Sequence, residues 1–258
     1  MGKLLVESDL SQEEVRVAAH LSNCKGLIEL FLRDGDPHTE TAARIFGLSM
    51  DVAELEKYRY PTKRMNFGVI YGITEEGLSA DIEEHVADIM DDDSSADLVV
   101  WSVDECARLI REWYKLYPEI KDFRMEQAAH ARRYGYVKDM FGRIRFVPEI
   151  YCPIWTIQEA GVRQAGNMTV QSSSQGIVKL GMARLFRERN EWQLQDRVRF
   201  LLQIHDSLLL EVDDDPDFVK WCATWLRDGM CGVVQLRVPL CADIKTGYNW
   251  AEMGVLPK

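Results

Sequence analysis

The spacing of apolar residues predicts a chain of alternating helices and short strands. Residues 4–8 (LLVES) indicate a strand that ends at Asp9. A helix is expected to open at Ser11, because the apolar residues that follow recur at helical spacing. Ser11 and Glu14 also have the S-x-x-E spacing of a capping box.

The same patterns predict the remaining elements. Helices are expected at residues 36–58 with a break near Gly47, 61–71 ending at Gly72, 103–133 with an interruption at Tyr117–Pro118, 156–190 and 215–230. Hairpins are expected at residues 134–148 and 197–212, and a last strand near 236–244. Because hairpins dominate, we expect an α+β fold with antiparallel strands.

Composition indicates an intracellular protein with a sizeable core. The 258 residues are 47% apolar, enough for one large domain or two linked subdomains. No apolar run approaches the roughly 20 residues of a membrane span, and we expect no signal peptide and no membrane partner. The six cysteines form no CxxC pair, which favours reduced core residues over a disulfide framework or a zinc site.

The net charge of −11 is concentrated in one segment. Residues 73–107 contain twelve Asp or Glu and no Lys or Arg, and without them the net charge is about +1. Within this segment, residues 74–97 are expected to form a surface insertion or a mobile loop. Basic clusters lie elsewhere, and each could equally be a solvated helix face; they are near residues 59–64, 132–138 and 143–145.

Two aspartates follow predicted strands. Asp9 ends the first strand, and Asp206 lies at the turn of LLQIHDSLLLEV (201–212). If these strands are neighbours, both carboxylates reach one sheet edge, where they could hold two Mg²⁺ ions for an in-line phosphoryl displacement. Alternatively, both are ordinary turn or N-cap residues.

A helical stripe lies before Gly72. Arg59, Lys63, Phe67 and Tyr71 are spaced by four, which places them along one side of a helix. Two cations followed by two aromatic rings could hold a triphosphate and stack on a base. Alternatively, the rings are core residues and the cations are solvated.

Six segments, in order, resemble the family A DNA polymerases, which are the DNA polymerase I-like enzymes. DLSQEEVRVAAHLS resembles motif A, RYPTKRMNFGVIYG motif B, and LLQIHDSLLLEV motif C, with further matches at residues 35–47, 135–148 and 167–185. The resemblance implies a palm made of residues 1–35 and 158–258. It also implies fingers made of residues 36–157, with an acidic insertion at about 74–105.

The resemblance also implies roles for individual residues. Asp9, Asp206 and the Leu10 carbonyl would bind two Mg²⁺ ions, for which Mn²⁺ could substitute. Glu14 would be the steric gate against a 2′-hydroxyl, and Lys63 would stabilise the leaving pyrophosphate. The dNTP would be bound by Gln12, Glu14, His38, Arg59, Lys63, Phe67 and Tyr71. The primer and template DNA would be contacted by Arg163, Asn167, Gln171 and His205.

Three features depart from the family pattern. Ser207 stands where Glu usually follows the His–Asp pair, so metal binding is expected to be retuned. Pro61 lies in motif B, so the helix is expected to start near Tyr60 with Arg59 at its cap. The chain begins one strand before motif A. We therefore expect a split polymerase whose second polypeptide supplies the thumb, the rest of the palm and possibly an exonuclease, unless the chain is an expression fragment.

The leading hypothesis is template-directed DNA synthesis in replication or repair. In this reaction the primer 3′-hydroxyl attacks the α-phosphate of a dNTP and pyrophosphate leaves. The expected location is the cytoplasm of a bacterium or of a virus-infected bacterial cell. A non-catalytic scaffold subunit is a second hypothesis, favoured by Ser207, Pro61 and the missing thumb. A metal-dependent nuclease is a third, but it would have no use for Glu14 as a gate.

Overall fold

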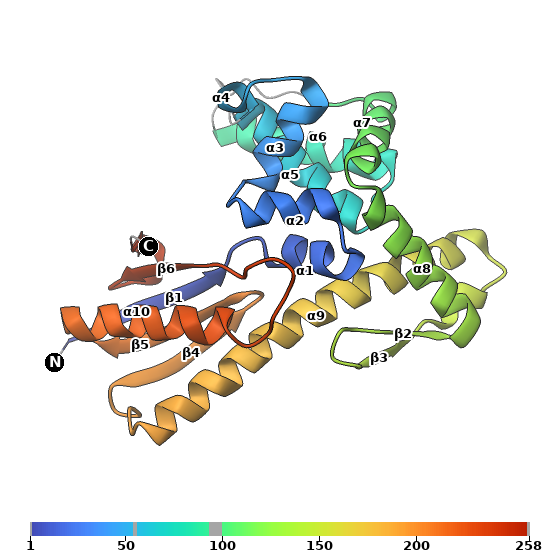
Figure 1. The fold of residues 1–258 in the computed structure, drawn as a ribbon. Helices are drawn as coiled ribbons and strands as arrows, with labels where there is room; N and C mark the ends of the chain where they lie inside the picture. Colours follow the sequence, from blue (N-terminus) through green and yellow to red (C-terminus); the bar gives the residue numbers. More distant parts are fainter. Residues whose placement is uncertain (1, 54–55, 93–99, 257–258) are drawn as a thin grey trace. The chain divides into compact units, whose positions relative to one another are not determined.

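The computed structural model describes residues 2–53, 56–92 and 100–256 (Figure 1). Its contacts divide the chain into two compact units. The sheet unit comprises Met1–Val17, Asp139–Arg143 and Val170–Lys258. The helical unit comprises Ala18–Lys138 and Ile144–Thr169. The assignment of palm and fingers to particular residue ranges stays a prediction.

The sheet unit is built on one antiparallel sheet with the strand order β4-β5-β1-β6-β7. The strands are β1 (Lys3–Leu10), β4 (Val198–Ile204), β5 (Ser207–Asp213), β6 (Ala242–Gly247) and β7 (Gly254–Val255). β1 pairs with β5 on one side and with β6 on the other. The first and last parts of the unit's sequence therefore meet in the middle of the sheet.

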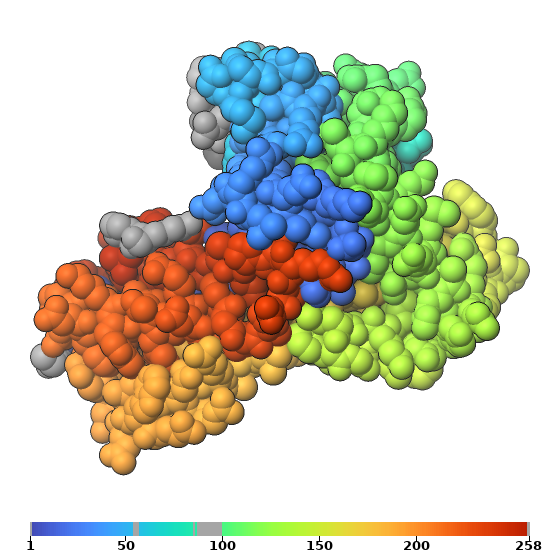
Figure 2. All heavy atoms as spheres, in the orientation of Figure 1, coloured from blue at the N-terminus to red at the C-terminus, as the bar shows by residue number. Residues whose placement is uncertain are grey.

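Helix α10 (Pro216–Cys231) lies across one face of this sheet and contacts β1, β5 and β6 (Figure 1). Asp215 begins the helix by accepting hydrogen bonds from the backbone N–H groups of Asp217 and Phe218. The buried side of α10 includes Cys222, Leu226 and Met230. Figure 2 shows the opposite side of α10, in orange, at the surface.

The helical unit contains most of the helices. They are α2 (Lys25–Leu32), α3 (Pro37–Phe46), α4 (Met50–Ala53), α5 (Glu56–Ile70), α6 (Glu75–Asp92), α7 (Val103–Leu116) and α8 (Pro118–Tyr134). A short hairpin, β2 (Tyr136–Lys138) and β3 (Ile144–Phe146), is followed by the 3-10 helix η1 (Pro148–Tyr151). Helices α1 (Glu13–Ser22) and α9 (Trp155–Glu191) each begin in one unit and end in the other.

Local sequence accounts for several helix ends. Asp36 caps α3 by accepting from the Thr39 N–H, and α3 ends at Gly47, whose φ of 65° suits glycine. Ser102 and Glu105 form a complete capping box at the start of α7.

The resemblance to an α+β polymerase fold is confirmed, and most predicted elements are present. The strand expected near 236–244 is shifted, because β6 starts at Ala242, and a further short strand, β7, follows it. Motif B also differs from expectation. α5 begins at Glu56, so Pro61 lies inside the helix and Arg59 in its first turn rather than at a cap.

The expectation of a loop in the acidic segment is wrong for residues 75–92, which form α6. Leu78, Ile82 and Val86 are spaced by four and buried, and Asp81 forms an ion pair with Arg64 of α5. Residues 93–99, which carry the rest of the acidic run, lie outside the described residues. Within the described part of the chain, no helix is both long enough and apolar enough to cross a bilayer.

Candidate functional site

Asp9 and Asp206 lie close together where two inner strands of the sheet meet one of its ends: Asp9 is near the end of β1, and Asp206 directly precedes β5. β1 and β5 are neighbours, and Asp9 is directly opposite Ser207, the residue after Asp206. The Leu10 N–H donates to the Asp206 carbonyl at 3.3 Å. The condition for both carboxylates to reach one point, that their strands are neighbours, is therefore met.

The two-residue turn between β4 and β5 holds Asp206 in place. His205 adopts a left-handed conformation with φ of 52°, which is uncommon for a residue other than glycine. Its carbonyl accepts hydrogen bonds from the Gln203 side chain at 2.6 Å and the Gln175 side chain at 3.0 Å. Ser207 Oγ donates to the Ile204 carbonyl at 3.0 Å. These bonds close the turn and fix its backbone, while the His205 side chain is exposed.

The electrostatics of this edge indicate a place for cations. Burial raises the pKa of Asp9, with smaller contributions from Glu7 and Asp243, while Lys245 opposes the rise. Burial also raises the pKa of Asp206, and repulsion from Asp9 adds to the effect. Carboxylates that repel one another in a partly buried site are stabilised when a cation joins them.

Glu13 adds a further carboxyl that sequence reasoning missed. It lies at the start of α1 with 2% of its surface exposed, and its Oε1 has no hydrogen-bond partner. Burial, followed by repulsion from Asp206 and Glu14, raises its pKa to about 9. The sequence indicates this burial only through position: Glu13 lies one helical turn before Val17, on the side of α1 that carries apolar residues.

The start of α1 differs from the predicted capping box. The helix begins at Glu13, and Ser11 Oγ donates to Asp243 Oδ2 on β6 at 2.7 Å. Gln12 adopts a left-handed conformation with φ of 55° between β1 and α1. Glu14 is half-buried in the first turn of the helix.

The donor set at this edge fits Mg²⁺ or Mn²⁺. Among the described residues, no group of three or more His, Cys, Asp or Glu side chains is arranged to enclose a metal ion. A zinc site of the structural kind needs four such ligands. Mg²⁺, by contrast, is usually held by one or two carboxylates and takes its other ligands from water and substrate phosphates. The orphaned Glu13 Oε1 also shows that the polar groups here are incompletely satisfied by the protein itself.

The helical unit gathers His38, Arg59 and Lys63. Burial lowers the pKa of His38 to about 4; Asp36 opposes this shift, and Arg59 and Lys63 add to it. Arg59 Nε lies 3.1 Å from Asp36 Oδ2. Lys63 is exposed, and no carboxylate lies within ion-pair distance of it in the part of the chain that the structure describes. The three basic residues predicted for the triphosphate therefore lie within electrostatic range of one another.

Asn66, which sequence reasoning missed, positions His38. Its amide nitrogen donates to the Pro37 carbonyl at 3.1 Å and lies 2.9 Å from His38 Nδ1. Its amide oxygen accepts from Trp113 Nε1 at 2.7 Å. Because His38 Nδ1 accepts a hydrogen bond from the Asn66 amide, the single proton of neutral His38 lies on Nε2.

The stripe of α5 borders an open hollow. A cavity of about 260 Å³ is lined by Lys63, Arg64, Phe67, Gly68, Tyr71, Ile73 and Asp81. The Phe67 ring is half-buried and lies 5.6 Å from the His38 ring, centroid to centroid. The stripe predicted from spacing is therefore a partly exposed surface rather than a buried one, which favours its use in binding.

The end of α5 is held by two other helices. Arg124 of α8 donates to the Ile70 carbonyl at 2.7 Å. The Asn167 amide of α9, in the orientation that satisfies its neighbours, donates to the carbonyls of Tyr71 and Arg163 at 3.0 Å. Tyr71, which was predicted to bind the nucleotide, thus lies beside Arg163 and Asn167, which were predicted to contact DNA. The part played by Arg124 was not visible in the sequence.

The last predicted DNA contact, Gln171, is exposed and lies one helical turn beyond Asn167 on α9. Next to it, the turn of the β2–β3 hairpin is fixed to α9. Ser172 Oγ donates to Asp139 Oδ2 at 2.6 Å, and Arg143 donates to the Ser172 carbonyl. Arg143 Nε also donates to Asp139 Oδ2 at 2.6 Å.

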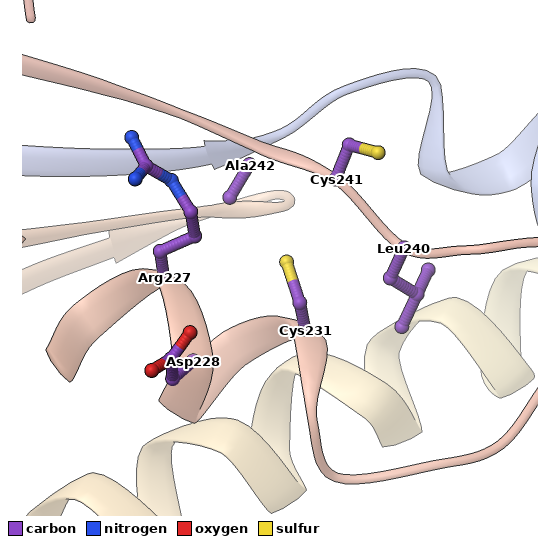
Figure 3. Close-up of a pocket in the computed structure, with 6 residues that line it drawn as sticks. All are labelled: Arg227, Asp228, Cys231, Leu240, Cys241 and Ala242. Atoms are coloured by element: carbon purple, nitrogen blue, oxygen red, sulfur yellow. The ribbon is translucent and has the colours of Figure 1, made fainter. Parts of the chain in front are cut away.

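A second cavity lies in the sheet unit, between the end of α10 and the segment before β6 (Figure 3). It measures about 300 Å³ and is lined by Arg227, Asp228, Cys231, Leu240, Cys241 and Ala242. Burial raises the pKa of the Cys231 thiol to about 11, so this thiol is a poor nucleophile at neutral pH. The Cys241 carbonyl accepts from the Ser11 N–H at 2.9 Å, which ties this segment to the end of β1.

The chain is similar to known proteins along nearly its whole length. The model of a family described as DNA polymerase family A matches residues 1–252. DNA polymerase I of Caldicellulosiruptor bescii is 32% identical over 253 residues, covering 97% of this chain and 27% of that protein. The thermostable DNA polymerase I of Thermus aquaticus is 33% identical over 249 residues, covering 96% of this chain and 27% of that protein.

A solved structure has a similar fold. It is the POL domain of Pol1 from M. smegmatis in complex with DNA primer-template and dNTP. The TM-score is 0.82 at 29% sequence identity, and the match covers 96% of this chain and 40% of that one. The chain thus spans about a quarter of the length of its curated relatives.

Proposed function

Because the chain belongs to DNA polymerase family A, we propose that it carries out template-directed DNA synthesis. The reaction would transfer a nucleotide from a dNTP to the primer 3′-hydroxyl. The observation that supports this best is the placement of Asp9 and Asp206 on neighbouring strands at one sheet edge. A phosphoryl-transfer enzyme needs acidic ligands at such a point, while its other residues position the substrates.

We propose that Asp9, Asp206 and the Leu10 carbonyl hold two Mg²⁺ ions, which Mn²⁺ could replace. When bound, such ions activate the attacking hydroxyl and neutralise charge on the transferring phosphoryl group. Burial is the main cause of the raised pKa of both aspartates, and repulsion from Asp9 adds to the rise at Asp206. This supports the assignment, because a bound cation would relieve that repulsion. The hydrogen bonds that close the turn around Asp206 fix its direction before substrate arrives.

Arg59, Lys63, His38 and Gln12 would bind the triphosphate. Lys63 is exposed and would meet the β- and γ-phosphates as a cation, and it could donate a proton to the leaving pyrophosphate. His38 would contribute a neutral Nε2–H donor, because its Nδ1 is engaged by Asn66. Arg59 would have to exchange its ion pair with Asp36 for a phosphate.

The remaining residues would position the sugar, the bases and the DNA. Glu14 would exclude a 2′-hydroxyl, Phe67 would stack on the incoming nucleotide, and Tyr71 would hold the template-base position until the nucleotide enters. Primer and template would be contacted by Arg163, Asn167, Gln171 and His205. Minor-groove acceptors are nearly the same for every correct pair, so polar side chains there can test the geometry of a pair.

We further propose that a second polypeptide completes the enzyme by supplying the thumb, the rest of the palm and possibly an exonuclease. The match covers 40% of the chain of a solved polymerase domain, and the comparison itself does not place the remainder on the same or on a second polypeptide. Affinity purification of the tagged chain from its host, followed by mass spectrometry, tests this. Recovery of a thumb-bearing partner would support it. A single longer polypeptide that carries both parts would contradict it.

Primer extension tests the activity itself. The chain would be supplied with primer-template DNA, Mg²⁺ and four dNTPs, with and without the purified partner. We expect template-directed extension, with the partner raising activity because thumb contacts to phosphates supply DNA affinity. Absence of extension under every condition would contradict the proposal. It would favour the scaffold hypothesis, which the serine at position 207 also favours.

A further inference from the structure

The positively charged side chain of Lys245 lies among acidic residues near Asp9. In the β1–β6 ladder, Glu7 is opposite Lys245 and Asp9 is opposite Asp243. Residues two apart on a strand share a face, and residues directly opposite in an antiparallel pair do as well. One face of this strand pair therefore carries three carboxylates and the Lys245 ammonium.

Lys245 is held in this position by its neighbours. Its Nζ lies 3.7 Å from Glu7 Oε2, and the Lys245 side chain is 36% exposed against 9% for Glu7. Glu7 Oε1 in turn accepts a hydrogen bond from Trp250 Nε1 at 3.3 Å. The ammonium is thus anchored to a buried carboxylate on the strand that carries Asp9.

The charge of Lys245 acts on Asp9. It is the largest influence on the Asp9 pKa after burial, and it acts against burial by favouring the ionised carboxylate. The same positive charge repels any other cation that binds to Asp9. Screening by solvent weakens this repulsion, and a divalent ion feels it twice as strongly as a monovalent ion does.

We infer that Lys245 lowers the affinity of the site for divalent metal ions. It would not bind the metal itself but would act through Asp9, where its positive charge repels a bound cation. The inference rests on the proposed function, because it assumes that Asp9 and Asp206 are the metal ligands. Ser207, next to Asp206, adds no negative charge to the site. The positive charge of Lys245 then lowers the net negative charge of the site further. The enzyme is therefore expected to need more free metal than its carboxylates alone would require.

Direct metal binding tests the inference. Mn²⁺ binding would be measured by electron paramagnetic resonance of the free ion at pH 8 and low salt, without DNA or nucleotide. Lys245→Met is expected to bind Mn²⁺ about three- to tenfold more tightly than the unchanged protein. Lys245→Arg keeps the charge and is expected to bind as the unchanged protein does.

Lys3→Met is the matched control. Lys3 also lies on the sheet and forms a cross-strand ion pair, with Asp213 at 2.8 Å, but it is six residues from Asp9 on β1, roughly 20 Å away. It should leave Mn²⁺ affinity unchanged. The Mg²⁺ concentration for half-maximal primer extension should fall in Lys245→Met alone.

Three outcomes are distinguishable. Tighter binding in Lys245→Met alone supports the inference. Unchanged or weaker binding in Lys245→Met, with binding abolished by Asp206→Ala, overturns the inference and leaves the proposed function in place. Mn²⁺ binding that survives Asp206→Ala, or no detectable binding in any variant, contradicts the metal assignment and the inference with it.

Discussion

Asp9 on β1 lies directly opposite Ser207 on β5. Ser207 is 8% exposed, and its hydroxyl donates to the Ile204 carbonyl, so it closes the turn that carries Asp206. Ser207, which the resemblance marks as a departure from the family pattern, thus has a structural task of its own. Asp9 lies opposite this serine on the neighbouring strand, and Asp206 lies in the turn that the serine closes.

Ser207→Glu should make stability depend on divalent metal. A buried carboxylate facing Asp9 adds repulsion, so we expect a lower melting temperature than the unchanged protein in EDTA. Mg²⁺ should restore most of the loss, because the cation joins the carboxylates. Thermal unfolding with and without Mg²⁺ measures this. Ser207→Ala, the control, should lose about 1 kcal/mol in both conditions. Equal losses for Ser207→Glu in both conditions would contradict the expectation.

Glu13 should make the metal-free protein less stable as pH rises. Its pKa is about 9 in the folded protein and near 4.5 when unfolded, so between these values only the folded state holds the proton. The contribution of Glu13 to the free energy of unfolding is therefore fully present below pH 4.5. It is lost as the pH rises toward 9, by at most about 1.4 kcal/mol per pH unit. Glu13→Gln should be more stable than the unchanged protein at pH 8 by a few kcal/mol, and similar at pH 5.

Urea denaturation in EDTA at both pH values measures the difference. Glu29→Gln, on the exposed side of α2, is the control and should change stability equally at pH 5 and pH 8. A Glu13→Gln variant that is less stable at pH 8 would show that Glu13 is ionised and paired in the folded protein.

His38 should have the opposite pH dependence. Its pKa is lowered to about 4 from 6.5, so between these values the unfolded chain binds the proton and the folded protein does not. Stability should therefore fall as pH falls from 6.5 to 4, by up to about 3 kcal/mol. His38→Gln should remove that slope, measured as the difference in unfolding free energy between the two proteins. Parallel curves for the two proteins would show that His38 titrates normally.

Gly72 and Arg124 should be energetically coupled. Gly72 has a φ of 76°, and a Cβ at this position would meet the Arg124 guanidinium. Gly72→Ala should therefore cost more than the roughly 1 kcal/mol of backbone strain alone. Adding Arg124→Ala should remove the clash and leave the strain, giving a coupling energy of about 1–2 kcal/mol in a double-mutant cycle. Additive effects would show that Arg124 moves aside freely.

The sequence predicted the parts of the site that depend on local pattern. The two apolar runs around His205–Asp206 indicate a hairpin, and the spacing of four from Arg59 to Tyr71 indicates one side of a helix. The resemblance then supplied the order of the motifs. These features are visible because strand alternation and helical periodicity are properties of neighbouring residues.

Residues that act through distant contacts were not predictable in this way. Lys245 meets Glu7 only because β6 pairs with β1 in a particular register, and Asn66 of α5 meets Trp113 of α7 only in the folded chain. The acidic α6 was mistaken for a loop because its many charges obscure the apolar residues Leu78, Ile82 and Val86, which are buried. Pro61 was mistaken for a helix start because Pro is tolerated best in a first turn.

Addition of a single nucleotide tests the central claim most directly. One complementary dNTP would be offered to primer-template DNA with Mg²⁺ and the completed enzyme, and the extended primer quantified over time. We expect Asp206→Asn to slow the addition at least about a thousandfold, on the scale of removing an essential electrostatic group. Asp217→Asn, an exposed carboxylate at the start of α10, should change nothing. Addition by Asp206→Asn at the unchanged rate would contradict the claim that this sheet edge is the catalytic centre.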